Sequence, residues 1–388
     1  MHCLKQMKKR AWQFIDAHQE DMLAIWRHLV QTESGSMDQA GIDAVAQTIQ
    51  LQMDGLGAVT RRIDMSNAGS MLVSSWGKSN AAPILLLGHM DTVFPKGTAK
   101  ERPFTIQNGK AYGPGVLDMK GGIVIAIYVM KALQAAGYCT RPIKLILAGD
   151  EETAHQQSNA AACIRKEAEG AVAAFNCETG FLDNGLVVQR KGSAVFEMCV
   201  QGIGAHAGNN PKGGRSAILE IAHKVIDIQN LTDWSAGTTF NVGIIQGGTV
   251  VNAIPDIASI QIDVRYLNPE DIGTIQQQLQ QIAAKRYVPD TKTIVRQVVG
   301  FAPMKPVEGT DALFEVVKRT YQEMNLPAPH AILIGGGSDS AYTTLAGVPT
   351  ICAMGVKGEN NHTPREYADV SSLFERAKLL AACIMNRE

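Results

Sequence analysis

The sequence lacks the features that mark several classes of protein. Its 388 residues carry 36 basic and 37 acidic side chains, so no excess charge favours nucleic acid or an anionic membrane surface as a partner. The seven cysteines are an odd number, are widely scattered and form no Cys-x-x-Cys pair, so no disulfide framework is indicated. We therefore expect a small-molecule partner and a reducing, cytoplasmic environment.

Long apolar runs are also missing near the start of the chain. Residues 11–30 contain Trp12, Trp26 and Leu29, but charged residues such as Asp16 and Arg27 interrupt them. That spacing predicts an amphipathic helix and excludes a signal-peptide core or a membrane span there. No Gly-x-Gly-x-x-Gly follows the first predicted strand, which disfavours a dinucleotide enzyme.

Helical and strand patterns alternate between about residues 38 and 188. This alternation predicts an α/β fold, a mixed sheet with helices on both faces. The predicted helices are 40–56, 122–136 and 158–169, and the predicted strands are 71–75, 84–87, 143–147 and 171–175.

The pattern changes near Lys191 to strand, helix, strand, strand, helix, strand, which is typical of a compact two-layer α+β unit. We predict an inserted domain at residues 191–302 and a catalytic domain made of residues 1–190 and 303–388. Strands at 331–334 and 350–354 would return the chain to the first sheet. His362 could then lie near His89 in space.

Residue types that bind metals recur where the predicted strands end. His89 and Asp91 follow the predicted strand 84–87, Glu151 and Glu152 follow the strand 143–147, and Glu178 follows the strand 171–175. Because ligands in α/β sheets gather beyond the carboxyl ends of the strands, we expect these side chains to meet. With Asp118 and His362 they offer two histidines and at least three carboxylates, the ligand set of a hydrolytic pair of metal ions.

Asp118 lies in a glycine-rich turn, where a carboxylate could bridge two ions and offset their repulsion. Taken alone, the turn could be ordinary and Asp118 could cap the following helix. The adjacent acids at 150–152 repel one another unless a cation or a proton relieves them. We predict Glu152 as a metal ligand and Glu151 as general base and acid. A solvated acidic loop is the alternative for these residues.

Weaker signals lie in and after the inserted domain. His206 stands in a loop of small residues, but a lone histidine is more often neither ligand nor catalyst, and Asn252 is an equally weak signal. Arg265 could pair bidentately with a substrate carboxylate. The glycine run 335–337 could supply N–H donors to the same anion, although such a run is more often only a turn.

In this order the motifs resemble those of a di-zinc metallopeptidase family that includes bacterial glutamate carboxypeptidase, aminoacylase, peptidase T and succinyl-diaminopimelate desuccinylase. They are His-x-Asp, Gly-x-Gly-x-x-Asp-x-Lys-Gly-Gly, Asp-Glu-Glu, a later Glu, Gly-x-x-Ala-His-Ala-Gly and a final His. The glutamate carboxypeptidase branch is the most similar, through residues 112–115, 335–339 and 362–367. Pro114, where many relatives carry Arg, is tolerated in that branch.

The resemblance implies a zinc-exopeptidase-like catalytic domain with two zinc ions, and cobalt or manganese could use the same ligands. One ion would be bound by His89, Asp118 and Glu178, and the other by Asp118, Glu152 and His362. Asp91 would orient His89, and Glu151 would be the base.

The resemblance also implies a homodimer formed through the inserted domain. His206 would then reach the partner's active site and stabilise the tetrahedral oxyanion, with help from Asn252. Arg265 and the region of Gly336 would bind the substrate's carboxylate. The Asp118–Met119 peptide bond is expected to be cis.

The expected reaction is hydrolysis of an amide next to a free carboxylate, of the carboxypeptidase type, on a small peptide or an N-acyl amino acid. An aminoacylase-like or desuccinylase-like amidohydrolase would keep the site and change the substrate. A non-catalytic metal-dependent binding protein would have no need of Glu151. The sequence does not specify the side chains on either side of the bond.

Overall fold

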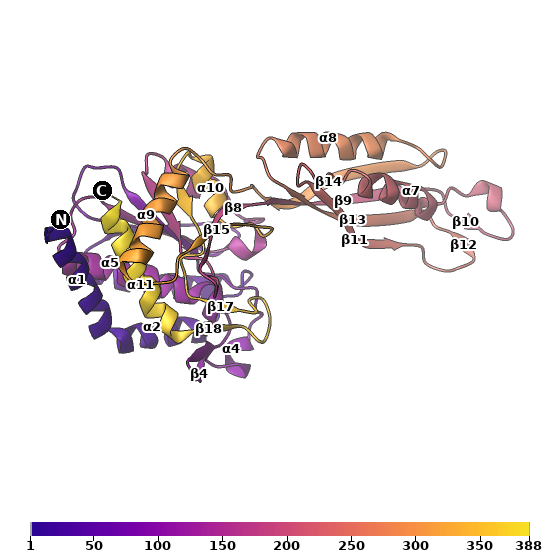
Figure 1. Ribbon diagram of the computed structural model, residues 1–388. Helices are drawn as coiled ribbons and strands as arrows, with labels where there is room; N and C mark the ends of the chain where they lie inside the picture. The colour runs from indigo at the N-terminus through magenta and orange to yellow at the C-terminus, as the bar shows by residue number, and fades with distance from the viewer. Residues whose placement is uncertain (1, 388) are drawn as a thin grey trace. The chain divides into compact units, whose positions relative to one another are not determined.

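The computed structural model describes residues 2–387, and these divide into two compact units (Figure 1). Unit 1 contains the residues up to Gln189, the segment Pro306–Leu333 and the residues from Ser338 onward. Unit 2 contains Arg190–Lys305 and the short segment Ile334–Gly337. The glycine run therefore groups with the inserted unit, although the sequence pattern assigned it to the catalytic domain.

Unit 1 is built on a mixed six-stranded sheet, as the sequence predicts. Its order is β1 (Val59–Ile63), β2 (Met71–Trp76), β6 (Ile143–Ala148), β3 (Ile84–His89), β7 (Ala173–Asn176) and β16 (Thr350–Ile351). The last four strands are parallel, whereas β1 and β2 are antiparallel to their neighbours. The carboxyl ends of β6, β3 and β7 consequently lie along one edge of the sheet.

Both faces of this sheet are buried. In β3, Ile84 and Leu86 belong to the main apolar core, while the alternating Leu85 and Leu87 are equally buried on the opposite face. Helices α1 (His2–Ala17), α5 (Gly121–Ala136) and α11 (Val370–Asn386) pack side by side, and α5 contacts β3 (Figure 1). Two other helices, α6 (Ala160–Ala168) and α10 (Ser340–Leu345), pack against each other. Helix α6 also contacts β6, and α10 contacts β7 and β16.

Further elements complete unit 1. They are α2 (Gln19–Gln31), α3 (Gln39–Gly55), α4 (Thr98–Glu101), α9 (Thr310–Glu323), the turn η1 (Val116–Lys120), the turn η2 (Glu151–Thr153), and a four-stranded sheet of β17 (Gly358–Glu359), β18 (Tyr367–Asp369), β5 (Lys110–Tyr112) and β4 (Thr105–Gln107).

Unit 2 is a two-layer α+β structure. Its antiparallel sheet has the order β11 (Thr239–Gly247), β13 (Ile257–Tyr266), β9 (Gly192–Gln201) and β14 (Lys292–Phe301). Helices α7 (Ala217–Gln229) and α8 (Asp271–Ala284) complete its core, and burial alternates along β9 because only one sheet face contacts them. Unit 2 also contains a small antiparallel ribbon of β10 (Ala205–His206) and β12 (Ala253–Ile254), and the turn η3 (Pro211–Gly213).

Two details of the sequence interpretation were wrong. The helix predicted at residues 11–30 forms as two helices separated at His18, whose ring bonds back to the Phe14 carbonyl oxygen at 2.7 Å. The strand predicted at 331–334 does not join the first sheet, because β15 (His330–Ile334) pairs with β8 (Gly185–Arg190) and is largely solvent-accessible. None of the helices formed by residues 2–387 has the length and apolarity needed to span a bilayer.

The start of α5 lies against the end of β7, and only glycine fits there. A Cβ at Gly122 would overlap the Cys177 carbonyl oxygen, directly before Glu178.

We expect Gly122→Ala to destabilise the fold by about 1–3 kcal/mol, since backbone must move to admit the methyl group. The midpoint of urea unfolding measures this. Gly55→Ala at the end of α3, where a Cβ meets nothing within 4 Å, is the matched control and should be neutral or slightly stabilising. Equal midpoints for the two variants would contradict the close approach.

Candidate metal centre

The carboxyl edge of the main sheet brings three predicted site residues together. His89 ends β3, Glu151 begins the turn after β6, and Glu178 lies two residues beyond β7. The Nε2 atom of His89 lies 3.7 Å from Glu178 Oε1 and 3.9 Å from Glu151 Oε2. All three side chains are buried, so a histidine nitrogen and two carboxylates face one another away from bulk water.

Asp118 faces both predicted histidine ligands. Its Oδ1 lies 3.3 Å from His89 Nε2, and its Oδ2 lies 3.1 Å from His362 Nε2. His362 Nε2 is also 3.1 Å from Glu152 Oε2. Asp118 thus directs one oxygen toward each histidine, which is the arrangement that a carboxylate bridging two cations requires.

The donor set suits cations. Two groups of ligand atoms lie within 4.8 Å of one another, His89 with Asp118 and Glu152, and His89 with Glu151 and Glu178. Glu152 Oε1 is buried and has no hydrogen-bond partner among the described residues. Nitrogen and carboxylate donors of this kind bind zinc and related first-row metals. These residues therefore fit a metal centre, and the proximity of Glu151 means that geometry alone does not separate ligand from base.

Burial and crowding shift the pKa values in this cluster. Burial raises the pKa of Glu151 well above its usual range, and neighbouring Glu178 and Glu152 raise it further. Hydrogen bonds to Asp118 and then Glu152 raise the pKa of His362 to about 11. Burial opposes ionisation of Asp118, but hydrogen bonds from His362 and His89 keep its pKa low. Protons and cations therefore compete for the same atoms.

Asp91 supports more than the histidine that it was predicted to orient. His89 Nδ1 lies 3.0 Å from the backbone carbonyl oxygen of Asp91 and 3.3 Å from its Oδ1. The same carboxylate accepts hydrogen bonds from the backbone N–H groups of Glu151 and Glu152, both at 3.1 Å, and from the Ser36 hydroxyl at 2.7 Å. One buried carboxylate thus fixes a histidine and the acidic turn together.

Sequence reasoning missed the residue that holds the Asp118 turn. Glu366 is buried and accepts hydrogen bonds from the N–H groups of Gly115, Leu117 and Asp118, at 2.8–3.0 Å. Burial raises the pKa of Glu366 to about 7. The acid stands four residues after His362 in a motif that was recognised, but nothing in its spacing indicated its backbone partners.

The Asp118–Met119 bond is cis, which confirms the expectation from the resemblance.

A second group that the sequence did not reveal lies next to the acidic turn. His155 is buried between Asp150 and Asp339, with its ring nitrogens 2.9 Å and 2.7 Å from carboxylate oxygens of the two acids. Asn361, adjacent to His362, donates to Asp118 Oδ2 at 3.0 Å. Its proximity to a predicted ligand was the available signal.

Within unit 2, His206 and Asn252 lie in neighbouring loops. The backbone N–H of Ala207 donates to the Asn252 carbonyl oxygen at 2.9 Å. His206 is exposed, and its Nδ1 accepts the N–H groups of Gly208 and Asn209, both at 3.1 Å. In the neutral ring the proton is therefore on Nε2, which can donate outward.

The structure also brings Arg265 to the glycine run within unit 2. Its Nη1 donates to the Gly335 carbonyl oxygen at 3.1 Å, and its Nε donates to Asp263 at 2.9 Å. Arg190, which the sequence did not single out, donates to the carbonyl oxygens of Gly336 and Gly337 at 3.2 and 2.8 Å. Two arginines therefore hold the carbonyl groups of this run.

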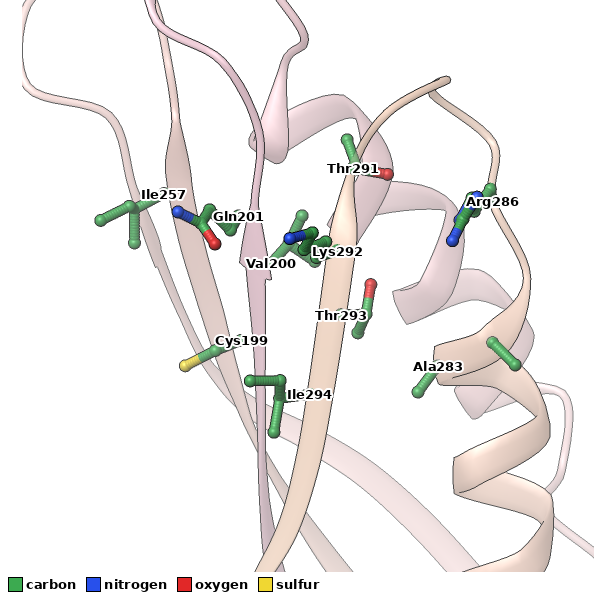
Figure 2. A pocket seen from close by; sticks show the side chains of 11 residues that line it. Cys199, Val200, Gln201, Ile257, Ala283, Arg286, Thr291, Lys292, Thr293 and Ile294 are labelled. Atoms are coloured by element: carbon green, nitrogen blue, oxygen red, sulfur yellow. The ribbon is translucent and has the colours of Figure 1, made fainter.

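Each of the two units contains a large hollow. One, of about 670 Å³, is in unit 1 beside Glu152 and is bounded by residues 35–38 and 92–96. The other, of about 620 Å³, is in unit 2, where Cys199, Ile257 and Ile294 line it from the sheet and Ala283 from the end of α8 (Figure 2). None of the predicted site residues lines the second hollow. The hollow in unit 1 therefore adjoins a residue of the candidate metal centre, whereas the hollow in unit 2 does not.

Comparisons with known proteins identify a family for this chain. The model of peptidase family M20/M25/M40 matches residues 85–386. Carboxypeptidase G2 of Pseudomonas sp. (strain RS-16) is 30% identical over 365 residues, which cover 92% of this chain and 87% of that protein. Succinyl-diaminopimelate desuccinylase of Anaplasma marginale (strain Florida) is 24% identical over 319 residues, 75% of this chain and 77% of its own length.

Solved structures show the same fold. Aminopeptidase PepT of Bacillus cereus ATCC 10987 superposes with a TM-score of 0.79 at 24% identity, over 95% of this chain and 98% of that one. The resemblance inferred from the motifs is thereby confirmed. The family match over most of the chain and the 30% identity to carboxypeptidase G2 over 92% of the chain establish that this protein belongs to peptidase family M20/M25/M40 and is a hydrolase of its metallopeptidase and amidohydrolase group.

Proposed function

We propose that this enzyme hydrolyses an amide bond next to a free carboxylate, in the manner of a carboxypeptidase, with two zinc ions in the centre described above. The observation that carries the proposal is Glu151. It is a buried acid with a raised pKa, its backbone N–H is bound by Asp91, and it lies among the residues that we propose as metal ligands. A protein that only bound metal would have no use for such a group.

His89, Asp118 and Glu178 would hold one ion, and Asp118, Glu152 and His362 would hold the other. Zinc bound there supplies Lewis acidity, which polarises the scissile carbonyl and makes the attacking water more acidic. Asp91 keeps His89 in the orientation that directs Nε2 into the site. Cobalt or manganese would fit the same donors.

Glu151 moves the protons. As a carboxylate it takes a proton from the attacking water, and as an acid it gives that proton to the leaving amine. Burial raises the pKa of Glu151, and a carboxyl group with a raised pKa is a stronger base as the carboxylate than an ordinary glutamate.

Unit 2 would provide the groups that meet the substrate's charges. The outward Nε2–H of His206 is suited to stabilise the oxyanion, with Asn252 in the neighbouring loop. Arg265, held next to Gly335 and Gly336, is suited to bind the substrate's carboxylate. We further propose that the protein is a homodimer through unit 2, and that His206 acts in the partner's site.

A second candidate reaction is removal of an acyl group from an N-acyl amino acid. Its support is the similarity to succinyl-diaminopimelate desuccinylases, at 24–25% identity over 75–78% of this chain. The metal centre and Glu151 would act in the same way, and only the group on the carbonyl side of the bond would differ.

The reaction is tested with a panel of dipeptides, α- and γ-glutamyl amino acids, and acetyl and succinyl amino acids. We expect the zinc-loaded protein to cleave the peptide or glutamyl members most efficiently. Glu151→Gln should lower kcat by about 10²–10⁴-fold, since general acid–base catalysis is lost, and should keep its zinc by elemental analysis. Glu101→Gln on the surface is the control. Activity of the Glu151 variant near that of wild type would refute the mechanism.

Metal binding should be coupled to proton release. Hydrogen bonds to Asp118 and Glu152 raise the pKa of His362 to about 11, so this proposed ligand carries a proton at neutral pH before a cation binds. Because zinc needs the unprotonated His362 nitrogen, apparent affinity should rise with pH between about 6 and 8. Calorimetric zinc titrations of chelator-treated protein, in buffers of different ionisation enthalpy, measure the protons released. Binding without proton release would contradict the proposed ligands.

The role of His206 can be tested by mixing two inactive variants. Glu151→Gln lacks the base, and His206→Ala lacks the residue proposed to act in the partner's site. Mixed dimers would contain one complete site each, so refolding equal amounts together should restore about a quarter of wild-type activity. Activity no higher than that of the separate variants, with dimers present by light scattering, would show that His206 does not act across the dimer.

A further inference from the structure

His155 connects two carboxylates that belong to different segments of unit 1. Its Nδ1 lies 2.9 Å from Asp150 Oδ1, and its Nε2 lies 2.7 Å from Asp339 Oδ1. Each of the three side chains is only 2% exposed. The ring therefore forms a buried bridge, with one nitrogen facing each acid.

One end of the bridge is the turn that carries Glu151 and Glu152. Asp150 directly precedes that turn, and the N–H groups of Ala154 and His155 close it by donating to the carbonyl oxygens of Glu151 and Asp150 at 2.7 and 3.1 Å. Ala154 and His155 have φ values of 53° and 55°, a left-handed conformation that few residues other than glycine adopt. This conformation turns the chain so that the His155 side chain returns to Asp150.

The other end of the bridge is anchored near Glu178. Asp339 directly precedes α10, and the hydroxyl of the next residue, Ser340, accepts a hydrogen bond from Asn176 Nδ2 at 2.9 Å. Asn176 ends β7, two residues before Glu178. Hydrogen bonds and short chain links therefore connect the Glu151 turn to the strand that carries Glu178.

The bridge is also the main electrostatic compensation of these acids. The Oδ2 atoms of Asp150 and Asp339 are buried and have no hydrogen-bond partner among residues 2–387. A buried carboxylate is costly unless it is paired and hydrogen-bonded, so loss of the imidazole would leave two such groups poorly compensated. The turn before Glu151 would then be expected to move.

We propose that His155 is a positioning residue, which holds the Glu151 turn in place by bridging Asp150 to Asp339. His155 touches neither substrate nor metal in this proposal, and it acts on turnover through Glu151. The inference rests on the proposed function insofar as it concerns turnover. The structural bridge itself does not depend on which substrate is cleaved.

Two variants break the same link from opposite sides. His155→Asn keeps a donor near Asp150 but cannot reach Asp339, and Asp339→Ala removes the other partner. We expect each to lower kcat by about tenfold or more, because misplacement of a catalytic group by about 1 Å is costly, with KM within about twofold. Zinc content should be unchanged. The double variant should be no slower than either single variant, because all three variants lack the same contact between residues 155 and 339.

His330→Asn is the matched control, since His330 forms a similar histidine–aspartate pair with Asp183, at 3.5 Å, but on the surface of unit 1. Its kcat should equal that of wild type. Losses that multiply in the double variant, or variants that lose thermal stability but keep kcat per zinc-loaded molecule, would overturn the positioning role.

Hydrogen exchange of the full-length protein tests the bridge without any substrate. The amides of Glu151, Glu152, Ala154 and His155 are all hydrogen-bonded. Peptides covering 148–157 should exchange about tenfold faster or more in His155→Asn and Asp339→Ala, and unchanged in His330→Asn. Unchanged exchange in all variants would refute the bridge. If the two variants exchange faster but the wild-type protein cleaves no member of the substrate panel, the bridge is supported and the proposed function is refuted.

Discussion

Repulsion among four buried carboxylates is the constraint on which the rest of the site depends. Asp118, Glu151, Glu152 and Glu178 gather around His89 at the carboxyl edge of one sheet, where their side chains are largely removed from water and their charges are poorly screened. Protons can relieve this repulsion, as the raised pKa of Glu151 shows, and divalent cations can relieve it more completely. A fold selected only for stability would gain by replacing such a cluster with apolar groups.

The surrounding structure holds each acid by its backbone. Asp91 accepts the N–H groups of the Glu151 turn, and Glu366 accepts those of the Asp118 turn. His155 joins the first turn to the loop before α10. Because these turns are held through their backbone N–H groups, the side-chain oxygens of the acids can serve metal ions and protons. The glycine at 122 allows α5 to approach the end of β7, which brings Asp118 and Glu178 to the same place.

The sequence predicted the sheet, most helices and the grouping of metal-binding residues, because apolar periodicity and strand-end chemistry are local signals. The ends of β3, β6 and β7 fell within a few residues of their predicted positions. The pairing of β15 with β8 was missed, since the apolar pattern of a segment predicts a strand but not the strand with which it pairs. Glu366, His155 and Arg190 were missed because their roles consist of hydrogen bonds to distant segments. No pattern of spacing encodes such partners.

The central claim is that two metal ions share Asp118 while Glu151 binds neither. Crystals of the zinc-loaded protein, measured on both sides of the zinc absorption edge, test it most directly. We expect two anomalous peaks about 3.5–4 Å apart, with Asp118 between them, His89 and Glu178 at one, and Glu152 and His362 at the other. A single peak, or a peak with Glu151 in its coordination shell, would contradict it.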